Sequence, residues 1–155
     1  MIKIIPKMEE LKNILVNAGL RPTFHRLKVL EYIFKHQYDH PTAEVIYEAL
    51  HKELPVISLA TVYNTMDILY KKGLLSILTI TGEEIRYDPN IENHHHFLCL
   101  KCGQLYDMDM QCPFGLPQKK IIDGHKIQEV HGYFKGICKK CLKKGGKDAE
   151  SPKNR

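Results

Sequence analysis

Cysteines are the residues of this 155-residue chain with the clearest capacity for chemistry. Four of the five form two Cys-x2-Cys pairs, Cys99 with Cys102 and Cys138 with Cys141. Two such pairs supply the four thiolates of a closed tetrahedral Zn2+ site, whereas one pair alone would also fit a redox motif. The spacing therefore predicts a structural zinc site, with a thiol redox switch on the same residues as the alternative. The fifth thiol, Cys112, is expected to be inert.

A second metal-binding pattern lies just before the first cysteine pair, in the run from His94 to His96. Side chains two residues apart in a strand face the same side, so the rings of His94 and His96 are expected to point together and His95 to point away. Imidazole nitrogens rather than sulfurs make this a separate candidate site. The pattern alone leaves open a solvent-exposed run, and it assigns no role to His125 or His131.

Hydropathy and charge narrow the class of protein. The chain has no long apolar run and no signal-peptide core, which predicts a cytoplasmic protein without a membrane span. In a reducing cytoplasm, cysteines serve as metal ligands more often than as disulfides. Of the net charge of +5, residues 135–155 carry eight basic and two acidic side chains, or +6, which leaves −1 for residues 1–134. Because this excess can balance a zinc–thiolate centre, charge alone does not predict DNA binding.

Four amphipathic helices are predicted in the first half of the chain from capping residues and apolar residues at helical spacing. They cover residues 8–18, 23–36, 43–53 and 59–72. Two segments rich in β-branched residues, 74–80 and 83–88, follow and are expected to pair as a hairpin. Three helices, a capped fourth helix and a hairpin together indicate a winged helix-turn-helix.

The fourth helix is the candidate DNA-contacting element. Its buried face is predicted to hold Leu59, Val62, Met66 and Leu69. The opposite face begins with small and amide side chains, which suits a helix that enters the major groove by its N-terminus.

Five residues are candidates for contact with DNA. Tyr63 and Asn64 are expected to contact bases, with Thr61 beside them, although Tyr63 could instead only pack on the hairpin. Arg21 and Arg26 could contact phosphates or a narrow A·T-rich minor groove, or could be solvated charges.

The predicted fold class is α+β, with two domains. Residues 1–88 form the winged helix-turn-helix, 89–93 a hinge, 94–142 a small α/β metal-binding dimerisation domain, and 143–155 a basic, disordered tail. The second domain is expected to contain a strand, a Cys-Gly knuckle, a strand, a short helix over 114–123 and two strands around Gly132. So small a domain needs additional support, which zinc and dimerisation would supply.

The chain resembles the ferric uptake regulator family in its motifs and their order. The matching segments are GLRPT-x2-R-x2-VL, HPTAE-x-IY, SLATVYNT, RYD, HHH-x2-C-x2-C-G and the second C-x2-C, between residues 19 and 141. The resemblance implies a metal-dependent homodimeric bacterial repressor that binds double-stranded operator DNA and is not an enzyme. A metal-dependent hydrolase is the remote alternative, for which no separate general base can be named.

The same resemblance implies a regulatory metal site shared by both domains. Its ligands would be His40, Asp88, His94, His96 and Asp107, a nitrogen and oxygen set that suits Fe2+ or Mn2+. A metal held by both domains would fix their relative orientation, and with it the spacing of the two DNA-contacting helices of a dimer.

Within the family, the chain is most similar to the peroxide-sensing repressors. Asp rather than Glu at position 107 favours that group, as does Asn64, where iron regulators usually have Arg. In such repressors bound Fe2+ reacts with H2O2 and oxidises a ligand, here His40 or His94 by position. The alternative is control of iron or zinc uptake, in which the same metal site would hold the two domains together as a clamp.

A further metal site of many iron regulators is predicted to be absent or rebuilt. The two histidine positions that it needs hold Asn93 and Val130 in this chain. His125 and His131 could substitute for them.

Overall fold

The computed structural model describes residues 5–80, 82, 84–92, 94–108, 121–122, 124–126 and 133–144. By contact density the chain divides into two compact units, Met1–Glu92 and Asn93–Arg155. Several sequence predictions lie outside the described residues; they concern Asn93, Cys112, residues 114–120, Val130, His131, Gly132 and residues 145–155. Among the described residues, no helix is both long and apolar enough to span a bilayer.

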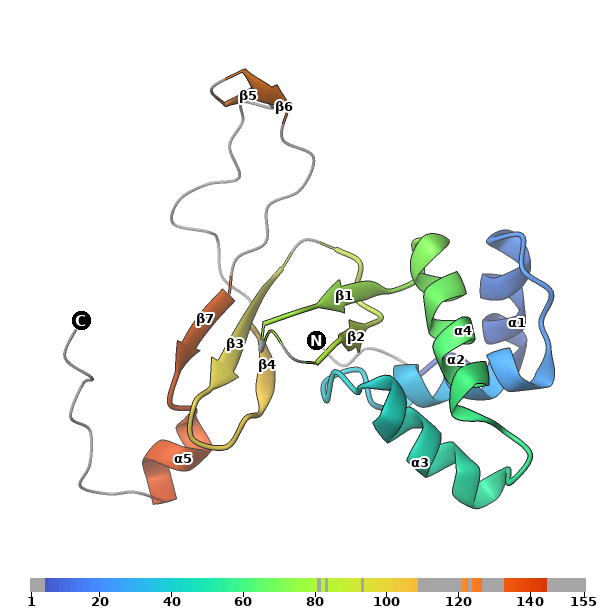
Figure 1. The fold of residues 1–155 in the computed structure, drawn as a ribbon, viewed down its shortest axis with the longest axis horizontal. Helices are drawn as coiled ribbons and strands as arrows, with labels where there is room; N and C mark the ends of the chain where they lie inside the picture. The colour runs from blue at the N-terminus through green and yellow to red at the C-terminus, as the bar shows by residue number, and fades with distance from the viewer. Residues whose placement is uncertain are drawn as a thin grey trace. The chain divides into compact units, whose positions relative to one another are not determined.

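Four helices form most of the first unit, and each agrees with its prediction to within a residue at either end (Figure 1). They are α1 (Met8–Asn17), α2 (Phe24–Lys35), α3 (Ala43–Glu53) and α4 (Leu59–Lys71). Three begin at a hydroxyl cap, because the side chains of Thr23, Thr42 and Ser58 each accept a backbone N–H three residues on. These caps satisfy N–H groups that a helix start leaves without a partner.

The core of the first unit combines the apolar faces of all four helices. Leu15, Leu30, Ile46, Val62 and Met66 are completely buried. The predicted inner face of α4 is wrong at one position, because Leu59 is 36% exposed while Thr65 is buried. A side chain at the first helical residue points past the helix end, which directs Leu59 toward solvent. The Thr65 hydroxyl is accommodated by donating to the Thr61 carbonyl (2.8 Å).

A hairpin of β1 (Ser76–Leu78) and β2 (Arg86–Asp88) completes the winged helix, with Ser76 opposite Asp88. Both strands are shorter than predicted, because the Thr79 carbonyl already accepts the Gly82 N–H (3.1 Å) and Gly82 takes a φ of +78°. The hairpin is tied to the segment before α3 by a bond from the Tyr87 N–H to the Pro41 carbonyl (3.1 Å).

The second unit contains a three-stranded sheet in the order β4-β3-β7 (Figure 1). Its strands are β3 (His95–Cys99), β4 (Leu105–Met108) and β7 (Tyr133–Gly136). Strand β3 runs antiparallel to β4 and parallel to β7. A separate hairpin pairs β5 (Ile121–Ile122) with β6 (His125–Lys126), and α5 (Lys139–Lys144) follows the sheet. The whole fold is therefore α+β, as predicted.

Two predictions for the second unit are wrong in detail. Residues 121–122 form a strand rather than the end of a helix, because two β-branched residues precede a turn in which Gly124 has a φ of +80°. Helix α5 continues to Lys144, two residues into the segment predicted to be a disordered tail. Its two terminal lysines lie where a helix dipole favours positive charge.

The packing predicts where the first unit is sensitive to mutation. Leu30→Ala, at a completely buried position, is expected to lower the free energy of unfolding by about 2–5 kcal/mol because it leaves a cavity. Val56→Ala, at a position 82% exposed, should change it by less than about 0.5 kcal/mol. Urea unfolding followed by far-ultraviolet circular dichroism measures both, and equal effects would contradict this description of the core.

Candidate metal centres and the exposed face of α4

Four cysteine sulfurs converge in the second unit. The Sγ atoms of Cys99, Cys102, Cys138 and Cys141 all lie within 4.8 Å of one another, and those of Cys102 and Cys138 are 3.9 Å apart. Four sulfurs bound at about 2.3 Å to a tetrahedral ion lie roughly 3.8 Å from each other. The cluster therefore fits a tetrahedral metal ion, as the spacing of the two pairs predicted.

The sheet and a tight turn bring the two cysteine pairs together. Strand β3 ends at Cys99, whose carbonyl accepts the Gly103 N–H (2.8 Å) and whose N–H donates to Gln104 (2.9 Å). Gly103 has a φ of +70°, a conformation that favours glycine, so the chain can reverse into β4. Cys138 follows the parallel strand β7, and its N–H donates to the Cys99 sulfur (3.3 Å).

The surroundings of the thiols separate their pKa values. A hydrogen bond from the Tyr106 hydroxyl is the largest influence on Cys138 and lowers the pKa of that thiol to about 6. Burial, followed by the neighbouring thiols, raises the pKa of Cys141 to about 12. A cluster that mixes thiolates and thiols releases protons when it binds a divalent ion.

Tyr106 is a contributor that the sequence analysis missed. Its hydrogen bond to Cys138 raises the pKa of the phenol to about 12, so the hydroxyl stays protonated and can donate to sulfur. Tyr106 lies on the strand that directly follows the first cysteine pair, and this position in the sequence could have indicated that it is close to the sulfurs.

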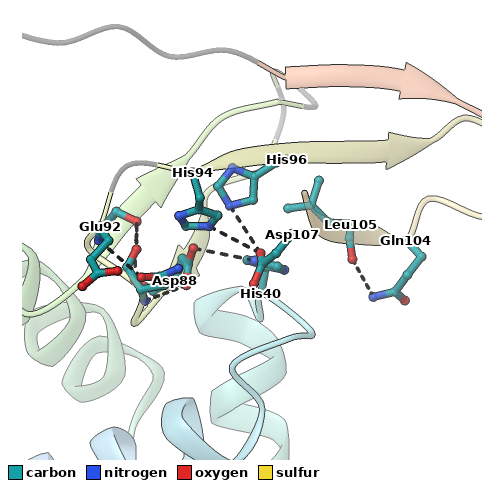
Figure 2. Close-up of polar contacts among 10 residues, drawn as sticks. His40, Asp88, Glu92, His94, His96, Gln104, Leu105 and Asp107 are labelled. Carbon is teal, nitrogen blue, oxygen red and sulfur yellow. Dashed lines mark hydrogen bonds and ion pairs between the residues drawn. The ribbon is translucent and has the colours of Figure 1, made fainter. Parts of the chain in front are cut away.

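In the first unit, His40 and Asp88 are buried and face each other (Figure 2). His40 Nε2 lies 3.8 Å from Asp88 Oδ2. His40 has a φ of +47°, which is unusual for a residue with a side chain, and the hydrogen bond between Pro41 and Tyr87 fixes the next residue beside β2. Asp88 is oriented through its other oxygen, because Oδ1 accepts the Asn90 N–H (2.7 Å).

In the second unit, His96 on β3, Asp107 on β4 and His94, just before β3, form a cluster (Figure 2). Asp107 lies directly opposite His96 in the register of β3 and β4. Its Oδ1 is 3.5 Å from His94 Nε2 and 3.7 Å from His96 Nε2. The ring of His95 instead contacts Phe134 edge-on at 5.9 Å between centroids, as expected from the alternation along a strand.

The nitrogen–oxygen separations within both groups have a common explanation. At 3.5–3.8 Å they exceed a hydrogen bond. Two donors bound to one ion at about 2.1 Å lie roughly 3.0–3.5 Å apart. The observed separations are up to a few tenths of an ångström longer than this, so small side-chain shifts would let the donors of each group bind one ion. Nitrogen and oxygen donors of this kind suit Fe2+, Mn2+ or Zn2+.

Helix α4 carries three of the five candidate DNA-contacting residues. Asn64 is exposed, as predicted, and Tyr63 is 40% exposed. Thr61 lies at the start of the helix, with its hydroxyl 2.8 Å from that of Ser58.

The tyrosine has a partner that the sequence analysis did not single out. The Tyr63 hydroxyl donates to a carboxylate oxygen of Glu44 on α3 rather than serving only to pack on the hairpin. The two residues are 19 positions apart, so no local pattern pointed to the pair.

Three other sequence candidates are described by the structure. Arg21 is exposed, and its carbonyl accepts a hydrogen bond from Arg26 Nη1 (2.9 Å). One N–H of the Arg26 guanidinium is thus used within the chain, and its role toward DNA stays a prediction. His125 is exposed on β6.

Comparison with known proteins gives consistent results. The sequence matches the model of the ferric uptake regulator family over residues 17–135. The peroxide-responsive repressor PerR of Staphylococcus epidermidis is 32% identical over 150 residues, covering 90% of this chain and 93% of that repressor. PerR of Staphylococcus aureus (strain Mu50) is 33% identical over 149 residues, covering 89% and 93%.

Solved structures show the same fold. The ferric uptake regulator of Vibrio cholerae superposes with a TM-score of 0.65 at 28% identity, over 82% of this chain and 98% of that one. The ferric uptake regulator of Helicobacter pylori gives a TM-score of 0.67 at 20% identity, over 97% and 100%.

The sulfur cluster predicts a specific loss of metal. Cys138→Ser should lose the tightly held ion, because only three thiolates remain in the site. Cys112→Ser removes the fifth thiol of the chain and should keep the ion. Inductively coupled plasma mass spectrometry of both purified variants tests this, and equal metal content would contradict the assignment.

Proposed function

The chain belongs to the ferric uptake regulator family, and we propose that it is a metal-dependent repressor that binds operator DNA as a homodimer and releases it on exposure to peroxide. Members of the family are transcription regulators rather than enzymes. The observation that carries the proposal is the arrangement of His94, His96 and Asp107, in which one Asp107 oxygen lies 3.5 Å and 3.7 Å from the two imidazole nitrogens.

The proposed regulatory ion is held jointly by His40 and Asp88 of the first unit and by the three ligands of the second. Two features support this. The separation of His40 from Asp88 (3.8 Å) is close to those in the second group (3.5 and 3.7 Å), and only residues 89–93 lie between Asp88 and His94. The orientation of Asp88 by Asn90 is the kind of outer contact that holds metal ligands in place.

The physical effect of such an ion is to favour one orientation of the two units over others. In a dimer this sets the distance between the two α4 helices, which must match half-sites about one helical turn apart or a multiple of it. Shifting the ratio of the DNA-binding orientation to all other orientations from 1:99 to 99:1 requires the ion to bind the first more tightly by about 5.5 kcal/mol. Five donors drawn from both units are the proposed source of this difference, because separation of the units removes ligands.

The sulfur cluster is proposed to hold a permanent structural Zn2+. All four of its cysteines belong to the second unit, so the ion does not depend on the orientation of the first. A closed set of four thiolates leaves no open position for a ligand or an oxidant.

Peroxide is proposed as the signal because the curated relatives at 32–33% identity are peroxide-responsive repressors. An Fe2+ ion held by these nitrogen and oxygen donors would activate H2O2, which would transfer one oxygen atom to a histidine ligand and leave as water. Asp107 is proposed to bind the same ion as His94 and His96, because one of its carboxylate oxygens faces a ring nitrogen of each. An oxidised imidazole is a weaker ligand, so the clamp would open and the repressor would leave DNA.

A metal-uptake regulator is the second candidate. It would use the same ligands and the same clamp, without oxidation. The structural similarity to the Vibrio cholerae ferric uptake regulator at 28% identity supports it.

The clamp predicts that the two faces of β3 differ in their effect on DNA binding. His96→Ala should raise the Mn2+ concentration needed for DNA binding about tenfold to hundredfold, because a ligand is lost. His95→Ala, on the opposite face, should leave it unchanged, and both variants should keep zinc. Fluorescence anisotropy with a duplex that wild type selects from a random pool measures this, and identical Mn2+ requirements would rule out the clamp.

The peroxide proposal predicts oxidation at defined residues. After brief exposure to micromolar H2O2, peptides containing His40 or His94 should gain one oxygen in the Fe2+-loaded protein, because only iron supplies the reducing equivalent at this site. The Mn2+-loaded protein serves as the control. Tryptic mass spectrometry detects the change, and its absence with iron would favour the metal-uptake regulator.

A further inference from the structure

The hydrogen bond between Tyr63 and Glu44 joins the exposed face of α4 to the start of α3. The phenol donates to Glu44 Oε1, and both side chains are exposed. The hydroxyl proton of Tyr63 is therefore not available to DNA, although the residue is exposed on a helix that is proposed to contact it.

Both ends of this bond are held by capped helix starts. Glu44 lies in the first turn of α3, where the Thr42 hydroxyl accepts the Val45 N–H (3.3 Å). Tyr63 follows the Ser58 cap of α4, where the Ser58 hydroxyl accepts the Thr61 N–H (3.1 Å). The bond therefore fixes the ring relative to two rigid helix ends rather than to a loop.

The pair is a carboxylate and a phenol at neutral pH. The hydrogen bond from Tyr63 is the largest influence on Glu44 and lowers the pKa of its carboxyl group. The same bond raises the pKa of Tyr63. A phenol has one proton to donate, so the bonded Tyr63 oxygen can only accept further hydrogen bonds.

This restriction determines which DNA groups suit Tyr63. Phosphate oxygens only accept hydrogen bonds, and the charge of Glu44 repels them. In the major groove, guanine O6 and N7 and thymine O4 also only accept, whereas adenine N6 and cytosine N4 donate.

We propose that Glu44 is a positioning residue for base specificity, which holds the Tyr63 phenol so that its oxygen accepts from an adenine or cytosine amino group in the major groove. This inference rests on the proposed function, because it requires α4 to contact bases. Glu44 itself needs no contact with DNA.

The test is selection from a random duplex pool with Mn2+-loaded full-length protein, followed by sequencing of the bound duplexes. Wild type should favour a base with an amino group at one position, and Tyr63→Phe should lose that preference by about threefold to tenfold. Glu44→Ala should change the preference at the same position, because the freed hydroxyl can donate. Glu44→Gln keeps an acceptor oxygen without the charge and should keep the wild-type preference.

Two further variants separate positioning from charge. Glu48→Ala removes an exposed acid one turn further along α3 and should leave the base preference unchanged. In the Tyr63→Phe background, Glu44→Ala should have no added effect at that position, because its partner is gone.

Each outcome decides the inference. It is overturned if Glu44→Ala leaves the base preference intact, or if it changes that preference equally with and without the Tyr63 hydroxyl. If wild type enriches no sequence at all with Mn2+, the proposed function fails, and this inference fails with it.

Discussion

The inner members of the two cysteine pairs lie 36 residues apart, yet all four sulfurs lie within 4.8 Å of one another. The pairing of β3 with β7 meets this constraint. Strand β3 ends in the first pair, and the parallel strand β7 ends just before the second. The peptide N–H of Cys138 then reaches the sulfur of Cys99. A metal ion at this point would hold together the ends of these two strands, which the small core of the unit stabilises only weakly.

The same strand links the sulfur cluster to the proposed nitrogen and oxygen ligands of the second unit. Strand β3 ends at Cys99 and begins at His95, so it carries His96 and follows directly on His94. Its register with β4 sets Asp107 opposite His96. The sulfur cluster at one end of the strand and the proposed regulatory ligands at the other thus share one element, while their different donor atoms favour different metals.

Contacts within the first unit hold His40 and Asp88, its two proposed ligands, in place without a metal. His40 holds an uncommon positive φ, and such conformations persist where surrounding contacts enforce them. Here the bond between Pro41 and Tyr87 holds the neighbouring residue, and Asn90 orients the carboxylate. Ligands that are already in place lose less conformational entropy when an ion binds.

Features with a local cause could be predicted from the sequence. Hydroxyl caps and apolar periodicity located α2, α3 and α4, and strand alternation separated His95 from His94 and His96. The parallel pairing of β7, the contact of Tyr106 with Cys138 and the bond of Tyr63 to Glu44 all join distant segments, so no short pattern predicts them. His40 and Asp88 also lacked a local signal, and only the family resemblance indicated them.

Counting the imidazoles on one bound Mn2+ tests the central claim most directly. Electron–nuclear double resonance of the Mn2+-loaded protein distinguishes nitrogen ligands from oxygen ligands. If one ion joins the two units, wild type should show three imidazole nitrogens and His40→Ala should show two. Two imidazoles in both proteins would mean that the first unit contributes no histidine to the site, and the clamp would be contradicted.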